Sequence, residues 1–167
     1  MHRTWVEIDK EALTTNIEQI RSILADGTDF CAVVKSNAYG HDIKTITQIC
    51  HHLGIHTFMV NSIEEGELIR KAYIHVRLYL WNWVDLDPQK IRALPANYIL
   101  PIYDASQLET LHEIAKASGK TIPINVILNT GMNRLGIHYT KLEPIIRTLV
   151  QYEKTLFFDS ISLFSLP

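Results

Sequence analysis

The chain has 167 residues and a formal net charge of -2, with 47% hydrophobic and 20% charged residues. This length and composition fit one packed domain and exclude extended disorder. No basic run suggests a nucleic-acid or anionic membrane partner, and the apolar stretches are too short to span a membrane. Cys31 and Cys50 fit the reduced core thiols of a cytoplasmic protein.

Strand-like and helix-like segments alternate along the chain. The N-terminal pattern over Thr4–Asp9 predicts a short strand rather than a signal peptide. Asp9 then caps a helix over 10–24, whose Leu13, Ile17, Ile20 and Leu24 fall on one face. Further strands are expected at 31–36, 57–61, 77–81, 98–102, 122–128 and 157–164, and helices at 43–53, 62–71, from Pro88, 104–119 and 141–151.

Several helix ends carry a local signal. Ser62 with Glu65 and Asp104 with Gln107 have the spacing of capping boxes. Pro88 suits the first turn of a helix, and Gly119 suits a helix end. The charged residues around 64–71 are interpreted as a solvated helix face.

The alternation predicts an α/β fold. Repeated β-α units imply parallel strands joined by right-handed crossovers, and near-continuous apolar strands fit a sheet buried on both faces. Counting from Cys31 gives about six parallel strands with helices outside, an incomplete TIM-type (β/α) barrel, since a closed one needs eight. Residues 1–167 are expected to form a single domain. A flatter doubly wound sheet is the alternative. Unpaired first and sixth strands would favour a dimer or a completing chain, or would leave the chain marginally stable.

One short segment carries the strongest chemical signal. The apolar run ending at Val34 delivers Lys35, and a polar, glycine-containing turn follows in the decapeptide Ala32–His41 (AVVKSNAYGH). Such a lysine lies at the carboxyl end of a buried strand, where α/β barrels do chemistry. Beside an apolar wall it loses its proton more easily and can form a Schiff base with a carbonyl cofactor such as pyridoxal phosphate (PLP). The alternative is a surface lysine at a strand end.

Three segments together indicate a family. The decapeptide resembles the PLP-lysine motif of the alanine racemase family. Asn129–Ile137 (NTGMNRLGI) resembles a second family loop, and Thr4–Asp9 is similar to the family's opening. The resemblance implies a PLP-dependent isomerase that interconverts L- and D-alanine, with D-alanine serving cell-wall synthesis. It also implies that this sequence is the N-terminal part of the PLP-binding barrel, without the family's mostly β second domain.

The resemblance assigns roles to four residues. Lys35 would be the catalytic Schiff-base lysine and a proton-transfer base. Tyr39, expected at the start of a helix, would bind the cofactor phosphate, where a helix N-terminus favours an anion. Arg134 would bind the phenolic oxygen of PLP and, with Met132, line the substrate site. In the alternative interpretation Tyr39 and Met132 are packing residues and Arg134 is a surface arginine.

Departures from the family pattern weaken the enzyme interpretation for this chain alone. Ile127 replaces a frequent lysine that supports the arginine, Asn129 replaces an aspartate, and Leu163 replaces a histidine that stacks on PLP. The opposite-face base of the family is a tyrosine of the second domain, contributed across a dimer. A small amino acid as substrate and a homodimer or completing chain are therefore implied.

Two alternatives stay open: a non-catalytic racemase-derived fragment and a PLP-binding carrier. No metal site is expected, because His51, His52 and His56 lack matching cysteine or carboxylate spacing. Trp81 and Trp83 are expected to pack or to lie at an interface.

Overall fold

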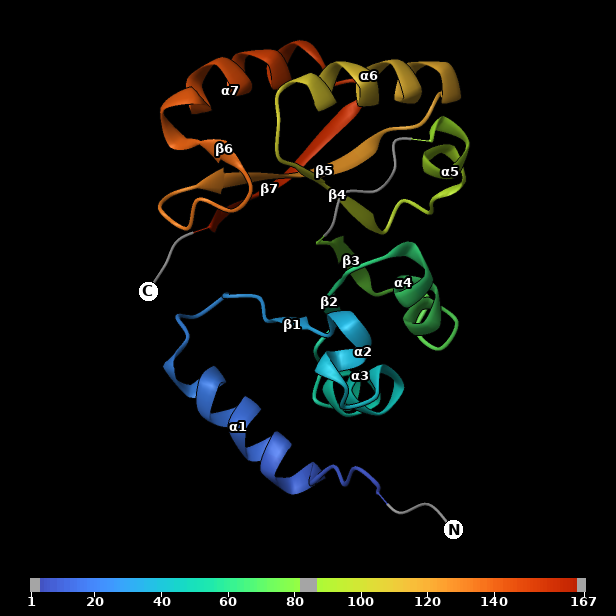
Figure 1. Cartoon of the computed structure of the whole chain (residues 1–167), viewed down its shortest axis with the longest axis vertical. Helices are drawn as coiled ribbons and strands as arrows, with labels where there is room; N and C mark the ends of the chain where they lie inside the picture. The colour runs from blue at the N-terminus through green and yellow to red at the C-terminus, as the bar shows by residue number, and fades with distance from the viewer. Residues whose placement is uncertain (1–3, 82–86, 165–167) are drawn as a thin grey trace. The chain divides into compact units, whose positions relative to one another are not determined.

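The computed structural model describes residues 4–81 and 87–164, so Trp83 lies outside the described residues. The chain forms two compact units, and the boundary between them falls after Leu78, within a strand (Figure 1). Each unit has its own core of buried aliphatic side chains. No helix in the described ranges is both long and apolar enough to cross a bilayer.

Unit 1 places helices around two short parallel strands. Its elements are α1 (Lys10–Ile23), β1 (Cys31–Val33), α2 (Lys35–Tyr39), α3 (Ile43–His52), β2 (Thr57–Val60), α4 (Ile63–Arg70) and the first half of β3 (Arg77–Leu80). β1 and β2 pair in register from Cys31 opposite Thr57. The Val34 amide donates to the Met59 carbonyl at 2.9 Å, which extends the pairing one residue beyond β1.

Unit 2 is built around one long central strand. Its elements after β3 are α5 (Pro88–Ala93), β4 (Tyr98–Ile102), α6 (Ser106–Ser118), β5 (Ile122–Asn129), β6 (Ile137–His138), the 3-10 turn η1 (Tyr139–Lys141), α7 (Leu142–Gln151) and β7 (Leu156–Phe164). β5 runs parallel to β4, β6 and β7. α6 and α7 lie along one side of these strands (Figure 1). Burial of every β4 residue and of most β5 residues fits a sheet covered on both faces.

The local helix signals are largely confirmed. Asp9 accepts from the Ala12 amide at 3.0 Å and begins α1. Pro88 occupies the first turn of α5 behind an Asp87 cap, and Gly119 ends α6 with φ 66°. The six strands predicted from Cys31 onward are all present, and the two-residue β6 was not foreseen.

One prediction in the N-terminal segment is wrong, and the apolar face of its helix is mostly uncovered. Residues 4–9 form no strand, and Trp5 and Val6 are 74% and 69% exposed. On the predicted apolar face of α1 only Ile17 is buried, while Ile20 is 43% exposed. An alternating or helical pattern indicates which side chains could share a face, but a neighbouring element has to cover that face.

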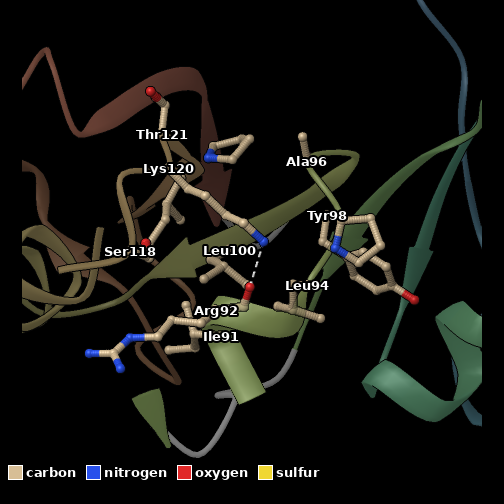
Figure 2. Close-up of a pocket in the computed structure, with 12 residues that line it drawn as sticks. Ile91, Arg92, Leu94, Ala96, Tyr98, Leu100, Ser118, Lys120 and Thr121 are labelled. Atoms are coloured by element: carbon tan, nitrogen blue, oxygen red, sulfur yellow. Dashed lines mark hydrogen bonds between the residues drawn. The ribbon is translucent and has the colours of Figure 1, made fainter. Parts of the chain in front are cut away.

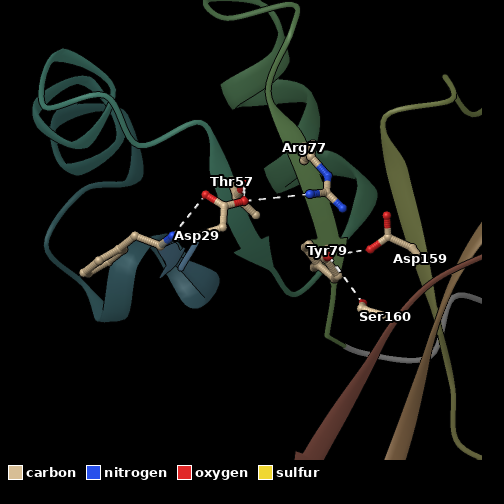
Figure 3. Close-up of polar contacts among 7 residues, drawn as sticks. Asp29, Thr57, Arg77, Tyr79, Asp159 and Ser160 are labelled. Atoms are coloured by element: carbon tan, nitrogen blue, oxygen red, sulfur yellow. Dashed lines mark hydrogen bonds and ion pairs between the residues drawn. The ribbon is translucent and has the colours of Figure 1, made fainter. Parts of the chain in front are cut away.

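Unit 1 contains a polar contact between neighbouring strands. Asp29, just before β1, accepts from the Thr57 hydroxyl at 3.1 Å and forms a 3.8 Å ion pair with Arg77 (Figure 3). Burial, and to a smaller extent the negative charge of Asp29, raise the pKa of the Cys31 thiol to about 11. Cys31 and Cys50 are both free thiols, as predicted.

A buried polar cluster joins β5 to β7 in unit 2. Asn125, which is 2% exposed, donates to Ser162 Oγ at 2.9 Å and accepts from Ser160 Oγ at 3.1 Å. Tyr79 donates to Asp159 and lies 3.4 Å from Ser160 Oγ (Figure 3). These contacts satisfy polar groups that would otherwise be costly to bury among aliphatic side chains.

Candidate active site

Lys35 follows directly after the carboxyl end of β1. Val34 before it is 1% exposed, and Lys35 itself is half-buried. The predicted place of the lysine at a strand end is confirmed, whereas β1 itself is only partly buried, with Val33 43% exposed. The strand stops earlier than predicted, at Val33 instead of residue 36.

The segment labelled α2, which begins at Lys35, is a left-handed turn and not an ordinary α-helix. Ser36, Asn37, Ala38 and Tyr39 have φ between 53° and 55°, and Gly40 closes the turn at φ 89°. Hydrogen bonds from the Ala38 amide to the Val34 carbonyl (2.8 Å) and from the Gly40 amide to the Ser36 carbonyl (3.2 Å) hold it together. Left-handed helical backbone costs roughly 1–2 kcal/mol for each non-glycine residue. Neighbouring structure has to offset that cost.

A carboxylate from α4 contacts this turn. Glu65 Oε1 accepts from the Asn37 amide at 2.9 Å, and Oε2 accepts from the Asn61 amide at 2.8 Å. Ser62 accepts from the Glu65 amide at 3.3 Å, so half of the predicted capping box is present. The side chain of Glu65 turns instead to two other amides, and the prediction that it lies on a solvated face is wrong.

Tyr39 lies at the end of the turn, which corrects the prediction that it starts a helix. The next helix, α3, begins at Ile43, whose amide donates to Asn37 Oδ1 at 2.9 Å. Asp42 caps α3, and hydrogen bonds from Thr45 lower the pKa of its carboxyl. Tyr39 is 60% exposed and can therefore meet a ligand.

The second candidate loop, residues 129–137, follows β5 and is organised by its first side chain. Asn129 Oδ1 accepts from the amides of Gly131 (3.1 Å) and Asn133 (3.0 Å), and Nδ2 donates to Asn133 Oδ1 at 3.0 Å. An aspartate could accept both amide hydrogens but could not donate. Asparagine is thus suited to the loop in its own right. Arg134 is exposed and Met132 is half-buried in this loop.

Ile127 and Gly136 pack closely at the base of this loop. Ile127 is 2% exposed, and a Cβ on Gly136 would lie 2.9 Å from the Ile127 carbonyl oxygen. Gly136 also has φ 107°. The Ile127 side chain therefore packs in the core at the base of the loop.

Two buried hydroxyls at strand ends in unit 2 were not foreseen from the sequence. Thr130 Oγ1 follows β5 and Tyr103 Oη follows β4, and neither finds a hydrogen-bond partner in the described part of the chain. Burial raises the pKa of Tyr103 to about 12, so the group stays a neutral donor. Unsatisfied buried hydroxyls are uncommon, and the carboxyl ends of parallel strands are where α/β barrels bind ligands.

The candidate residues divide between the units: Lys35 and Tyr39 belong to unit 1, Met132 and Arg134 to unit 2.

Within unit 2, an apolar cavity of about 430 Å³ lies at the other end of β5, beside Tyr98, Ile122 and Pro123 (Figure 2). Lys120 Nζ donates to the Arg92 carbonyl oxygen there at 2.6 Å. This cavity is separate from the loop that carries Arg134.

Solved structures establish the class of fold. The chain resembles alanine racemase from Bacillus anthracis with bound L-Ala-P over 98% of its length, with a TM-score of 0.82 and 24% identity. It also resembles histidine racemase from Leuconostoc mesenteroides over 94%, with a TM-score of 0.80 and 23% identity. In each case it covers 42% of the solved chain. The predicted barrel-type α/β fold, incomplete in this chain, is confirmed.

Sequence comparison adds the family. The chain belongs to the alanine racemase family, because residues 8–165 match the family described as "Alanine racemase, N-terminal domain". It is 33% identical over 135 residues to an alanine racemase of Synechocystis sp. and 32% identical over 168 residues to one of Nostoc sp.. These matches cover 80% and 98% of this chain but only 36% and 42% of the relatives, so the chain spans about two fifths of their length.

Proposed function

We propose that this chain is the lysine-bearing part of a PLP-dependent amino-acid racemase, with alanine as the substrate. The observation that carries the proposal is Lys35 on a hydrogen-bonded turn at the carboxyl end of the parallel strand β1, next to the buried Val34. The curated relatives near 30% identity are named alanine racemases, which favours alanine. The histidine racemase of the same fold shows that fold alone does not select the amino acid.

The side chains present suit PLP. Lys35 would hold its aldehyde carbon covalently, Tyr39 offers an exposed hydroxyl for its phosphate, and Arg134 offers a permanently charged donor for its phenolic oxygen. The buried hydroxyl of Thr130, unpartnered in the described ranges, adds a donor in the same loop as Arg134. When bound, PLP supplies a ring that delocalises the negative charge left on an amino acid after its Cα proton departs.

In a racemase reaction these residues would have distinct roles. Lys35 would hold the cofactor and, once a substrate amine had replaced it, its Nζ would take or return the Cα proton on one face. Met132 would lie against the substrate beside Arg134. The base for the opposite face would come from a dimer partner or a completing chain. Ile127, buried and apolar, cannot hydrogen-bond to Arg134 as a lysine would.

The proposal places the protein in the cytoplasm, which suits its two free thiols, and assigns it to D-alanine supply. A non-catalytic PLP-binding protein is the second candidate. It is favoured by Ile127 and by Leu163, which is 68% exposed on β7 and offers no polar group to a ring. Both candidates require Lys35 to react with PLP, and only the first requires proton exchange at Cα.

The test is absorbance with added PLP, followed by borohydride reduction and peptide mapping. A stable pyridoxyl adduct on Lys35, lost in Lys35→Ala and kept in Lys44→Ala, is expected; Lys44 is an exposed lysine on α3. The absence of an adduct in the unaltered chain would overturn both candidates. Exchange of the Cα hydrogen of alanine in deuterium oxide then separates the racemase from the non-catalytic protein.

A further inference from the structure

Near the start of the left-handed turn, the Asn37 amide is hydrogen-bonded to a side chain from outside the turn. The Ala38 and Gly40 amides bond back to carbonyls of the same turn. The Asn37 amide instead donates to Glu65 Oε1 at 2.9 Å, across 28 positions of sequence. This is the first-turn situation of any helix, where amide hydrogens lack a partner within the helix.

Glu65 links that amide to a second strand end. Its other oxygen accepts from Asn61, the residue after β2, at 2.8 Å. The neighbouring β1 runs parallel to β2, and the turn with Lys35 follows β1. One half-buried carboxylate therefore joins the carboxyl ends of two adjacent parallel strands by two charge-assisted hydrogen bonds, which are stronger than neutral ones.

The side chain of Asn37 continues the connection on the other side. Asn37 Oδ1 accepts from the Ile43 amide at 2.9 Å, at the start of α3. The peptide of Asn37 is thus held from α4 and its side chain holds α3. The backbone direction of residues 36–39, and with it the placement of Lys35 and Tyr39, depends on these contacts because the conformation is unfavourable by itself.

We infer that Glu65 is a positioning residue of the PLP site: it holds the left-handed turn so that the Lys35 amine and the Tyr39 hydroxyl are presented together. This inference rests on the proposed function for its ligand, while the backbone effect is independent of any ligand. A carboxylate is required because both partners are donors. Glutamine offers one accepting oxygen and turns an NH₂ donor toward the other amide.

The first experiment is hydrogen exchange on the full chain without PLP, comparing the unaltered protein with Glu65→Gln, Glu65→Asp and Glu18→Gln. Glu18 is an exposed glutamate of α1, so its substitution removes the same charge from the same unit. Glu65→Gln should accelerate exchange over residues 36–41 about 10- to 100-fold, the factor expected for one lost charge-assisted hydrogen bond. Glu65→Asp keeps two accepting oxygens and should recover part of the protection.

The second experiment measures PLP affinity and the yield of the reduced Lys35 adduct in the same variants. Glu65→Gln should weaken affinity about tenfold or more, Glu65→Asp less, and Glu18→Gln not at all. If the unaltered chain binds no PLP, the proposed function fails, and the exchange data still decide whether Glu65 holds the turn.

Three results would overturn the inference. One is unchanged exchange over residues 36–41 in Glu65→Gln. Another is an equal loss of protection in the turn, β1 and α3, which would make Glu65 a general support of unit 1. The last is faster exchange in the turn with unchanged PLP affinity, which would leave Glu65 without a role at the cofactor.

Discussion

The turn after Lys35 and the loop carrying Arg134 are both irregular backbone segments after a parallel strand, but different kinds of side chain hold them in place. Each follows a parallel strand, and each contains backbone at positive φ. The first is held by Glu65, a side chain 28 positions away, whereas the second is held by Asn129, a side chain two and four positions away. The loop after β5 is therefore organised by its own sequence, while the turn after β1 depends on α4 being in place.

The two segments also end differently. Gly40 ends the turn with open space where a Cβ would lie, and Gly136 ends the loop against Ile127. Glycine is needed for backbone conformation alone in the first case, and for conformation and space in the second. Matched substitutions can separate these two requirements.

The largest effect is expected for Gly136→Ala. Its Cβ would lie 2.9 Å from the Ile127 carbonyl oxygen, at a residue with φ 107°. The free energy of unfolding should fall by roughly 2–4 kcal/mol, since strain and a backbone clash combine. Urea denaturation of the two proteins measures it. A loss below about 0.5 kcal/mol would mean that β5 and the loop can move apart freely.

A smaller loss is expected for Asn129→Ala, which leaves the Gly131 and Asn133 amides without the acceptor they share. The expected loss is about 1–3 kcal/mol in urea denaturation. Asn129→Asp is the matched control because it keeps that accepting oxygen, and it should retain most of the stability. Equal losses in the two variants would show that the donation to Asn133 is what organises the loop.

Gly40→Ala should cost less, roughly 1 kcal/mol, because only the positive φ of 89° opposes the new side chain. The comparison with Gly136→Ala under identical denaturation conditions isolates the steric contribution. If Gly40→Ala proved the more harmful of the two, the turn after Lys35 would be the more tightly constrained segment.

The smallest expected effect is on how the free energy of unfolding depends on pH through Asp42. Hydrogen bonds from Thr45 lower the pKa of Asp42 below its ordinary value in the folded chain. The folded state therefore binds this proton less readily, so the stabilisation is complete above the pKa of the unfolded chain. It is lost as pH falls through the lower, folded value. The unfolding free energy should fall less steeply below pH 4 in Asp42→Asn; parallel profiles would exclude the cap as a source of acid sensitivity.

Sequence alone determined much of this protein. The six strands predicted from Cys31 onward, the helix signals at Asp9, Pro88 and Gly119, and the presence of Lys35 at a strand end follow from patterns within a few residues. Such signals act over one turn or one strand, which is the range that a local pattern describes. The Asn129–Ile137 loop belongs to the same class, because its organising side chain lies inside it.

Only the tertiary structure decided the rest. The Ser62–Glu65 spacing predicted a cap, yet the carboxylate turned to Asn37 and Asn61 once α4 packed beside the strand ends. The apparent strand at 4–9 found no pairing partner in the described chain, and the left-handed turn at 36–39 contradicts the local preferences of Ser36, Ala38 and Tyr39. In each case the outcome depends on which distant groups arrive nearby to bury a face or satisfy an amide, and local spacing carries no record of that.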